Sequence, residues 1–411
     1  MQAFGGSMKK ILQKLMYIAS LGIVVLLLFA LVWAGDETAQ TQGEAVEPPK
    51  EAQNSESDNQ AEPGGEGAAE SVTQETEAAE SVTQGTEAAE EHTQKPQPPK
   101  EDTTILFGGD VLFGNAFLAG YDANGIAGVI SEELLLELQA ADVLMINNEF
   151  PFSTQGAPME GKQYTFRCEP SYVTALKEMG VDVVSLANNH VLDYGKAALS
   201  DTFVTLDGAG IRYGGAGESI ARAEQVQTFE INGKKFGFLA VSRVVPTGGW
   251  KVENSAPGVF SCYDDTRLIE LVEEAAKECD FLAVYPHWGV EYAAYPEDYQ
   301  TKIAQNCLAA GADVVVGSHT HCLQGAAYFG GQPVFYSLGN FVFGQTIDRS
   351  ALLKVTVTPE GEQRYQYLPI YAEGGVTKLA TGQKAQEILG YLQQISAGAV
   401  IAEDGTVSNK N

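Results

Sequence analysis

Four of the five histidines in this sequence come soon after apolar runs of the kind that form buried strands. These four are His190, His287, His319 and His321. Imidazoles that converge on one point gain little from each other, but they are frequent ligands of metal ions. His319 and His321 are one residue apart, and in a continuing strand their side chains would point the same way. The pattern therefore indicates a metal site.

Oxygen-bearing side chains follow the other strand-like runs. Asp110 follows residues 104–107, Glu149 follows residues 142–146, and Asn189 immediately precedes the first of these histidines. In open α/β sheets ligands bind beyond the carboxyl ends of the strands. The residues that we expect to meet there are Asp110, Glu149, Asn189, His287, His319 and His321. Taken singly, each also fits a cap, turn or loop role, so the hypothesis depends on their joint arrangement.

The mixture of ligands narrows the metal. Carboxylate, amide oxygen and imidazole without thiolate suit Mn²⁺, Fe²⁺ or Zn²⁺, and also Mg²⁺. The six candidates exceed the four ligands of one tetrahedral ion, so we expect two ions that share a carboxylate. Such pairs activate water and hold the oxygens of a transferring phosphoryl group.

Strand-like runs alternate with amphipathic segments from residue 103 onward, which predicts a layered α/β domain. The predicted strands are 104–107, 142–146, 182–186, 236–241, 280–285 and 313–316, and the predicted helices are 131–140, 170–179, 196–208, 266–278 and 297–310. Strands at 333–336, 352–357 and 365–370 follow without intervening helices, and predict a second sheet or an extension of the first. A closing helix over 379–397 and a frayed end complete the prediction.

An uncharged apolar segment, residues 15–34, has the length of a membrane-spanning helix. Lysines precede it and acidic residues follow it, so the positive-inside rule places residues 1–14 in the cytosol and the rest of the chain outside. A cleaved signal peptide is the alternative, because Val32-Trp33-Ala34 resembles a cleavage site. In both interpretations the domain that follows residue 102 is exported from the cytosol.

The segment 35–102 is predicted to be a disordered linker. Residues 36–102 carry 18 Asp and Glu against 3 Lys, a charge of −15 within a total of −29, and few apolar side chains. A polar decapeptide at 70–79 recurs almost unchanged at 80–89, which is typical of a spacer. The acidic balance argues against a nucleic-acid partner. The five cysteines lack a repeated short spacing, so we expect free thiols.

Six ordered blocks carry a resemblance to a known family. They are Gly109-Asp110-Val111, Asn148-Glu149, Ala187-Asn188-Asn189-His190 with Asp193-Tyr194-Gly195, His287-Trp288-Gly289, Gly317-Ser318-His319-Thr320-His321 and Ser337-Leu338-Gly339-Asn340-Phe341. Over residues 103–345 the sequence resembles the CapA/PgsA-type proteins of bacterial poly-γ-glutamate capsule synthesis, a branch of the calcineurin-like metallophosphoesterase superfamily. The resemblance implies a four-layer α-β-β-α sandwich of two mixed sheets over residues 103–380, followed by a C-terminal helix and tail over 381–411.

The resemblance also implies a role for each residue of the metal set. Asp110 and His321 would hold the first ion, Glu149 would bridge, and Asn189, His287 and His319 would complete the second. His190 would protonate the leaving oxygen or stabilise the transition state, with Asp193 holding its tautomer. Leu112 stands where the superfamily usually has the histidine of Asp-x-His, so the first ion would lose a ligand, leaving Asn115 or water in its place.

The function implied is that of a membrane-anchored, extracellular protein of poly-γ-glutamate capsule synthesis or export, with the polymer and its membrane synthase as partners. Two alternatives stay open. The ligand set favours an exported metal-dependent phosphoesterase unrelated to capsule, and Leu112 favours a non-catalytic accessory subunit. Because the chain is acidic, contact with a polyanion would require divalent ions or basic groups such as Lys162 and Arg167. Asn340 could hydrogen-bond into the pocket or serve as a turn residue.

Overall fold

The computed structural model describes residues 101–344 and 346–410. The predicted cytosolic segment 1–14, the predicted membrane segment 15–34 and all but the last two residues of the predicted linker 35–102 lie outside this part of the chain. Within it, no helix has the length and hydropathy needed to cross a membrane.

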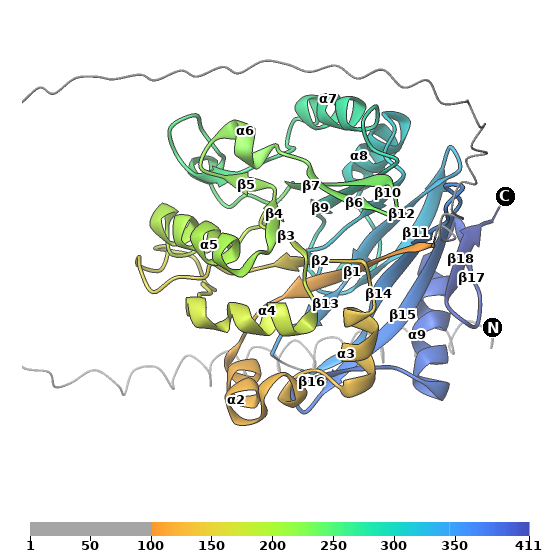
Figure 1. Ribbon diagram of the computed structural model, residues 1–411, viewed down its shortest axis with the longest axis horizontal. Coiled ribbons are helices and arrows are strands. Elements are labelled where there is room, and N and C mark those ends of the chain that lie inside the picture. Colours follow the sequence, from red (N-terminus) through yellow and green to blue (C-terminus); the bar gives the residue numbers. More distant parts are fainter. Residues whose placement is uncertain (1–100, 345, 411) are drawn as a thin grey trace, which may run out of the picture. The chain divides into compact units, whose positions relative to one another are not determined.

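Two mixed β-sheets and one short strand pair organise the described residues (Figure 1). The larger sheet has the order β17 (Ala399–Ile401), β18 (Thr406–Asn409), β15 (Gln363–Glu373), β14 (Ile347–Val357), β1 (Thr103–Val111), β2 (Val143–Asn148), β3 (Val183–Ser185) and β4 (Arg212–Gly214), with β13 (Asn340–Val342) on β1 and β16 (Val376–Leu379) on β15. The smaller has the order β11 (Leu323–Phe329), β12 (Gln332–Leu338), β10 (Val314–Val316), β9 (Phe281–His287), β7 (Lys234–Ser242) and β6 (Gln227–Ile231). Strands β5 (Ala216–Gly217) and β8 (Gly258–Val259) form the pair.

The helices of the described residues pack on the outer faces of the two sheets, except α9 (Gly382–Ile395), whose Ile388, Leu389 and Leu392 belong to the core between the sheets. The other helices are α2 (Asn115–Asn124), α3 (Glu132–Gln139), α4 (Val173–Met179), α5 (Lys196–Ala209), α6 (Ile220–Ala223), α7 (Thr266–Ala275) and α8 (Asp298–Ala309), with 3₁₀ turns at Gly125–Gly128, Pro170–Tyr172 and Gly248–Trp250. Figure 1 shows α2, α3 and α4 on one side of the sheets and α7 and α8 on the other. The prediction of a mixed α/β fold with more than one sheet is confirmed.

Three buried clusters account for this layering. Phe107 of β1 and Phe238 of β7 belong to the cluster between the two sheets. The neighbouring Leu106 points the opposite way and packs in a cluster with the helices over the larger sheet. In the smaller sheet, Leu239 of β7 likewise points away from the shared core and packs in a third cluster with α7 and α8. Strand alternation therefore assigns one face of each sheet to the shared core and the other to helices.

Local sequence signals explain several helix ends. The Ser131 hydroxyl accepts a hydrogen bond from the Leu134 amide and caps α3. Glu297 and Gln300 form a capping box at the start of α8. Helices α4 and α5 end at Gly180 and Gly210, both in the left-handed conformation predicted for such positions.

The C-terminal end differs from the prediction. The expected closing helix is α9, but the expectation of a frayed end is wrong. Strands β17 and β18 form a hairpin, and Tyr365 of β15 pairs with Val407 of β18. Val407 and Ala399 are buried in the core between the sheets. Burial of these alternating side chains orders the end of the chain.

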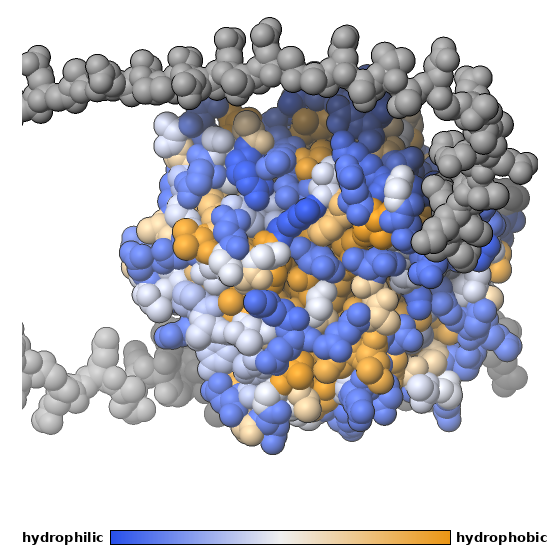
Figure 2. Space-filling view, viewed as in Figure 1, coloured by the Kyte–Doolittle hydropathy of each residue, from blue (hydrophilic) through white to orange (hydrophobic). Residues whose placement is uncertain are grey.

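The surface of the described residues is chemically mixed. Figure 2 shows one face, on which polar and apolar side chains intermingle. All five cysteines lie in the described part of the chain, and all are free thiols, as predicted. Burial raises the pKa of the Cys168 thiol to about 12, which keeps it protonated and unreactive.

Candidate metal centre

Three strands of the larger sheet bring oxygen ligands to one place. Asp110 lies within β1, which continues four residues beyond the predicted end, and is paired with Asn340 of β13. Glu149 directly follows β2, and its amide donates to the Val111 carbonyl of β1. Asn189 follows β3 by four residues. Asp110 and Glu149 are fully buried and Asn189 is nearly so, so the larger sheet contributes the oxygen donors.

Two strands of the smaller sheet bring the imidazoles. His287 ends β9, and His319 and His321 lie in the loop after β10. The ring centroids of His287 and His319 are 4.6 Å apart, and those of His319 and His321 are 6.0 Å apart. The three rings therefore converge, as expected.

The reason for this convergence differs from the prediction. Strand β10 ends at Val316, so strand alternation does not align His319 with His321. Both residues instead have positive φ, 99° and 55°. This conformation is strained for residues with a Cβ and occurs mostly where surrounding structure imposes it, often at functional sites. The loop thus turns both rings into the cluster.

Glycines before the ligands allow neighbouring segments of the chain to pack closely. A Cβ on Gly109 would lie 1.8 Å from the Gly339 carbonyl oxygen. A Cβ on Gly317 would lie 2.1 Å from the Tyr336 carbonyl oxygen and 2.3 Å from the Trp288 indole nitrogen. Only glycine fits at either position, so the motif residues beside Asp110 and His319 are required by packing.

The predicted ligands form two overlapping groups. Glu149, His287 and His319 have ligand atoms within 4.8 Å of one another, and so do Asp110, Glu149 and His321. Glu149 belongs to both groups. The Asn189 carboxamide oxygen is 2.8 Å from His287 Nε2 and borders the first group. The described residues thus contain a buried group of carboxylates and imidazoles that could hold a metal ion, with Glu149 common to both halves.

Several buried polar atoms in this cluster lack a hydrogen-bond partner among the described residues. They include both carboxylate oxygens of Glu149 and the Nδ1 atom of His319. Burying such atoms without a partner is costly, and most buried polar atoms in proteins avoid it. The atoms left over are carboxylate oxygens and an imidazole nitrogen, which are the donors that divalent ions take. The residues therefore fit a divalent metal ion.

The electrostatics favour the same interpretation. Burial, and then the neighbouring Asp110, raise the pKa of Glu149 well above its ordinary value. Burial lowers the pKa of His287 well below its ordinary value and lowers that of His319 to about 4, so both rings stay neutral and keep a lone pair. Burial opposes the charge on His321, but Glu149 and Asp110 outweigh it and raise its pKa to about 10. The buried carboxylates of Asp110 and Glu149 repel each other when both are charged, so a positive charge beside them would be stabilising.

A network of amides holds the ligands in place. The Asn147 amide nitrogen donates to Asp110 at 2.8 Å, and its carbonyl oxygen accepts from Asn188 at 2.9 Å. His321 Nδ1 lies 2.9 Å from the Asn340 carboxamide oxygen, so Asn340 contacts the site as considered. Ser318 lies 3.1 Å from His287 Nδ1. These supporting contacts orient the ligands before any ion binds.

A second cluster flanks the ligands. His190 Nδ1 lies 2.7 Å from the buried Asp193 carboxylate, which places the imidazole proton on Nδ1 and leaves Nε2 as the free nitrogen. Lys162 pairs with the other Asp193 oxygen and donates to the Asn189 carbonyl. Burial lowers the pKa of Lys162, and Asp193 acts in the opposite direction. Asp193 therefore has the geometry expected of a group that holds the His190 tautomer.

Comparison with known proteins places the chain in a family. The profile of the bacterial capsule synthesis protein PGA_cap matches residues 104–345, more than half of the chain. The chain belongs to the PGA_cap family. The match ends just after the block at Asn340 and spans all the candidate ligands.

Relatives of this PGA_cap protein carry capsule names. The PGA biosynthesis protein CapA of Bacillus subtilis is 32% identical over 269 residues, which cover 64% of this chain and 70% of that protein. The capsule biosynthesis protein CapA of Bacillus anthracis is 34% identical over 51% of this chain and 52% of that protein. A Mycobacterium tuberculosis relative named "Probable polyglutamine synthesis accessory protein" is 30% identical over 51% of this chain and 57% of that protein. Among solved structures, TT1561 of Thermus thermophilus is 12% identical over 61% of this chain and 93% of that chain, with a TM-score of 0.35.

The structure of the PGA_cap domain brings together every residue predicted for the site. Asn115, a candidate only as a replacement for the ligand missing at Leu112, does not join them, because it is exposed at the start of α2. Sequence reasoning missed Asn147 and Asn188 as supporting residues, although an asparagine in a buried strand end is a usable signal. The sequence suggests Lys162 only as a basic contact for the polymer and does not predict its ion pair with Asp193.

Proposed function

We propose that this PGA_cap protein acts in poly-γ-glutamate capsule synthesis or export through a divalent metal centre of metallophosphoesterase type. The observation that carries the metal centre is the fully buried Glu149 carboxylate, which has no hydrogen-bond partner among the described residues and belongs to both ligand groups. Family membership and the names of the relatives support the capsule role.

Residues of this chain suit the binding of two ions. Asp110 and His321 would hold one ion, His287, His319 and the Asn189 oxygen would hold the other, and Glu149 would bridge. When bound, such a pair supplies Lewis acidity and lowers the pKa of water. We propose Mn²⁺, Fe²⁺ or Zn²⁺, with Mg²⁺ as a further candidate, because oxygen and imidazole donors are mixed and thiolates are absent from the set.

Elemental analysis tests this centre directly. The full-length chain, reconstituted with each metal and freed of excess ions, is expected to hold about two ions, the number that a shared-carboxylate site takes. His319→Ala should hold fewer ions per chain. His92→Ala, which changes a histidine outside the predicted ligand set, should match the wild type. A wild-type chain that retains no ion under any of these conditions would refute the metal centre.

A second candidate function is hydrolysis of a phosphoester or a related bond. The arrangement of His190, Asp193 and Lys162 beside the ligands favours it. A His190 ring protonated at Nε2 would donate that proton to the leaving oxygen, while Asp193 holds the ring by its Nδ1 proton and stabilises its charged form. Metal-loaded protein should then hydrolyse generic phosphodiesters, and His190→Ala should lose about 10²–10⁴-fold in rate. Activity that survives this substitution would rule out the assigned role.

A third candidate is a non-catalytic accessory role. Leu112, which is buried two residues after Asp110, supports it because the superfamily usually has a histidine ligand there. In that case the metal centre would shape a surface that contacts the polymer or its synthase. The discriminating measurement is polymer output in cells carrying Asp110→Ala or His319→Ala. Output unchanged by folded variants would exclude a role of the centre in capsule production.

We also propose that residues 15–34 anchor the protein and that the domain lies on the extracellular side. The apolar length of this segment, the preceding lysines and the acidic segment after it support this topology. Protease added to intact cells should release the domain, and the remaining N-terminal fragment should stay with the membrane. A domain protected from protease until the cells are lysed would contradict this orientation.

A further inference from the structure

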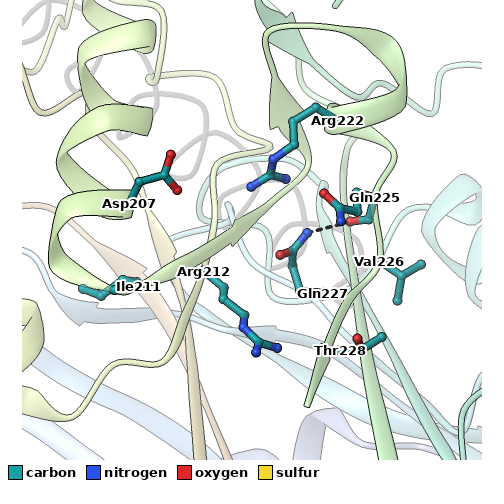
Figure 3. Close-up of a pocket in the computed structure, with 9 residues that line it drawn as sticks. Asp207, Ile211, Arg212, Arg222, Gln225, Val226, Gln227 and Thr228 are labelled. Atoms are coloured by element: carbon teal, nitrogen blue, oxygen red, sulfur yellow. Dashed lines mark hydrogen bonds between the residues drawn. The ribbon is translucent and has the colours of Figure 1, made fainter. Parts of the chain in front are cut away.

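A pocket outside the metal centre has an unusual lining. It has a volume of about 480 Å³ and lies between the C-terminal end of α5, the start of β4, α6 and β6. The lining residues are Asp207, Gly210, Ile211, Arg212, Arg222, Gln225, Val226, Gln227 and Thr228. Figure 3 shows Arg212 and Arg222 on two sides of the space, with Gln227 between them and Asp207 facing them.

This pocket is separate from the metal centre. Arg212 begins β4, which runs parallel to β3. The metal ligand Asn189 follows the opposite, carboxyl end of β3. Arg212 therefore lies at the amino end of the parallel strands, away from the edge where the ligands gather.

Both arginines are held by aromatic rings and not by carboxylates. The Arg222 guanidinium lies 3.8 Å from the centre of the Tyr213 ring and donates to the Tyr213 carbonyl at 3.1 Å. The Arg212 guanidinium lies 4.1 Å from the centre of the Phe229 ring. Within the described part of the chain, neither forms an ion pair. Stacking fixes the planar guanidinium and leaves most of its five N–H donors available.

The adjoining pocket provides an internal comparison. It has a volume of about 680 Å³ and also contains Gln225 and Val226. Its arginine, Arg267, pairs with Glu224 and Glu270 through contacts of 3.0 Å. Its lysine pairs with a glutamate as well. The cations of that pocket are ion-paired, whereas Arg212 and Arg222 form no ion pair among the described residues, although Asp207 lines the same pocket. Arg212 also lies near enough to Asp182 to oppose the rise that burial causes in the pKa of that carboxyl.

We propose that the pocket formed by Arg212 and Arg222 binds a small acidic ligand. One carboxylate or phosphate group would contact the two guanidiniums, which match such groups through paired hydrogen bonds. The volume exceeds what a single inorganic ion fills, so the ligand carries further atoms. The Asp207 carboxylate, on the facing side of the pocket, accepts hydrogen bonds, so an amine or hydroxyl of the ligand would face it. The buried Gln227 amide lies between the arginines and supplies a further polar contact.

The test measures binding to the full-length chain in detergent and in the presence of chelator, so it does not depend on the metal centre or on the proposed function. The probes are L-glutamate, glutarate and inorganic phosphate, each titrated by calorimetry. We expect saturable binding of one ligand per chain, weakened by about tenfold or more in Arg212→Gln and in Arg222→Gln. Arg212 is exposed and makes no hydrogen bond through its side chain among the described residues, so its variant keeps the test valid if the other fails to fold.

A charge-matched control separates a built site from general attraction. Arg364→Gln removes an exposed arginine of β15 that pairs with Glu362, and should change affinity by less than about twofold. Asp207→Asn should weaken L-glutamate but not glutarate, which lacks the amine. Binding of the dicarboxylates alone identifies a carboxylate ligand, and binding of phosphate alone identifies a phosphorylated one. Absence of saturable binding by every probe, or equal loss in Arg364→Gln, overturns the proposal.

Discussion

Replacing the Glu149 carboxylate should make the protein more stable than the wild type when metal is absent and less stable than the wild type when metal is present. This carboxylate is fully buried, lacks a hydrogen-bond partner among the described residues and lies near Asp110, and these surroundings raise its pKa well above the ordinary value. Glu149→Gln keeps the shape of the side chain and removes the charge. His321 loses one of two neighbouring carboxylates but keeps Asp110, from which its Nδ1 atom is 3.3 Å away. Without metal, the variant should therefore be more stable than the wild type.

The expected gain comes from relieved repulsion between two buried carboxylates and is on the order of 1 kcal/mol, because the amide of the variant is itself left without a hydrogen-bond partner. Bound metal makes the wild type the more stable of the two proteins. An ion that binds only the folded state, present at a concentration of about 100 times its dissociation constant, adds about 2.7 kcal/mol to the free energy of unfolding. The variant loses the bridging ligand and should gain little from metal. The assay is thermal unfolding of both proteins, first with chelator and then with saturating Mn²⁺.

Glu360→Gln is the matched control for this experiment. Glu360 is exposed in the turn between β14 and β15, so the same chemical change should alter neither melting temperature. The reasoning fails if Glu149→Gln melts below the wild type in chelator, or if Mn²⁺ stabilises it as much as it stabilises the wild type. The first result would mean that the carboxylate is already satisfied, and the second that it is not a ligand.

Three further substitutions probe the surroundings of the site. Gly317→Ala forces a Cβ against backbone and an indole ring, and should cost about 1–3 kcal/mol in the free energy of unfolding and reduce bound metal. Gly208→Ala has open space inside α5 and should instead stabilise the protein by about 0.5–1 kcal/mol, measured in the same denaturant titrations. Asp193→Asn leaves the half-buried Lys162 without its counter-ion and should cost about 1–3 kcal/mol, while metal content, measured by elemental analysis, stays unchanged.

Most elements that carry the site could be predicted from the sequence. Buried strands such as β9 and β10 are apolar runs in the sequence, and the helices between them have clear caps and glycine stops. The predicted bounds of these elements therefore lie close to the observed ones. The prediction for strand β1 ends four residues too early, because Gly108 and Gly109 interrupt its apolar run. Gly109 lets β1 approach Gly339, a contact that only the fold reveals.

The failures have physical causes. Strand β4 and helix α6 are too short for any period to appear, so the arginine pocket that they border had no signal. The left-handed backbone of His319 and His321 is imposed by tertiary contacts and leaves no trace in residue type. Lys162 lies in an irregular loop 31 residues before its partner Asp193, and such pairings cannot be read from local spacing.

The division of ligands between the sheets explains why the cluster is built as it is. Asp110, Glu149 and Asn189 come from the larger sheet, and the three imidazoles come from the smaller one. Each half alone would be an ordinary strand end, and the carboxylate half would be repulsive. The halves meet because the apolar faces of both sheets bury each other, which is a large and non-specific stabilisation. Hydrophobic packing therefore brings the carboxylates and imidazoles together, and the unsatisfied atoms that remain at the junction are what a divalent cation can satisfy.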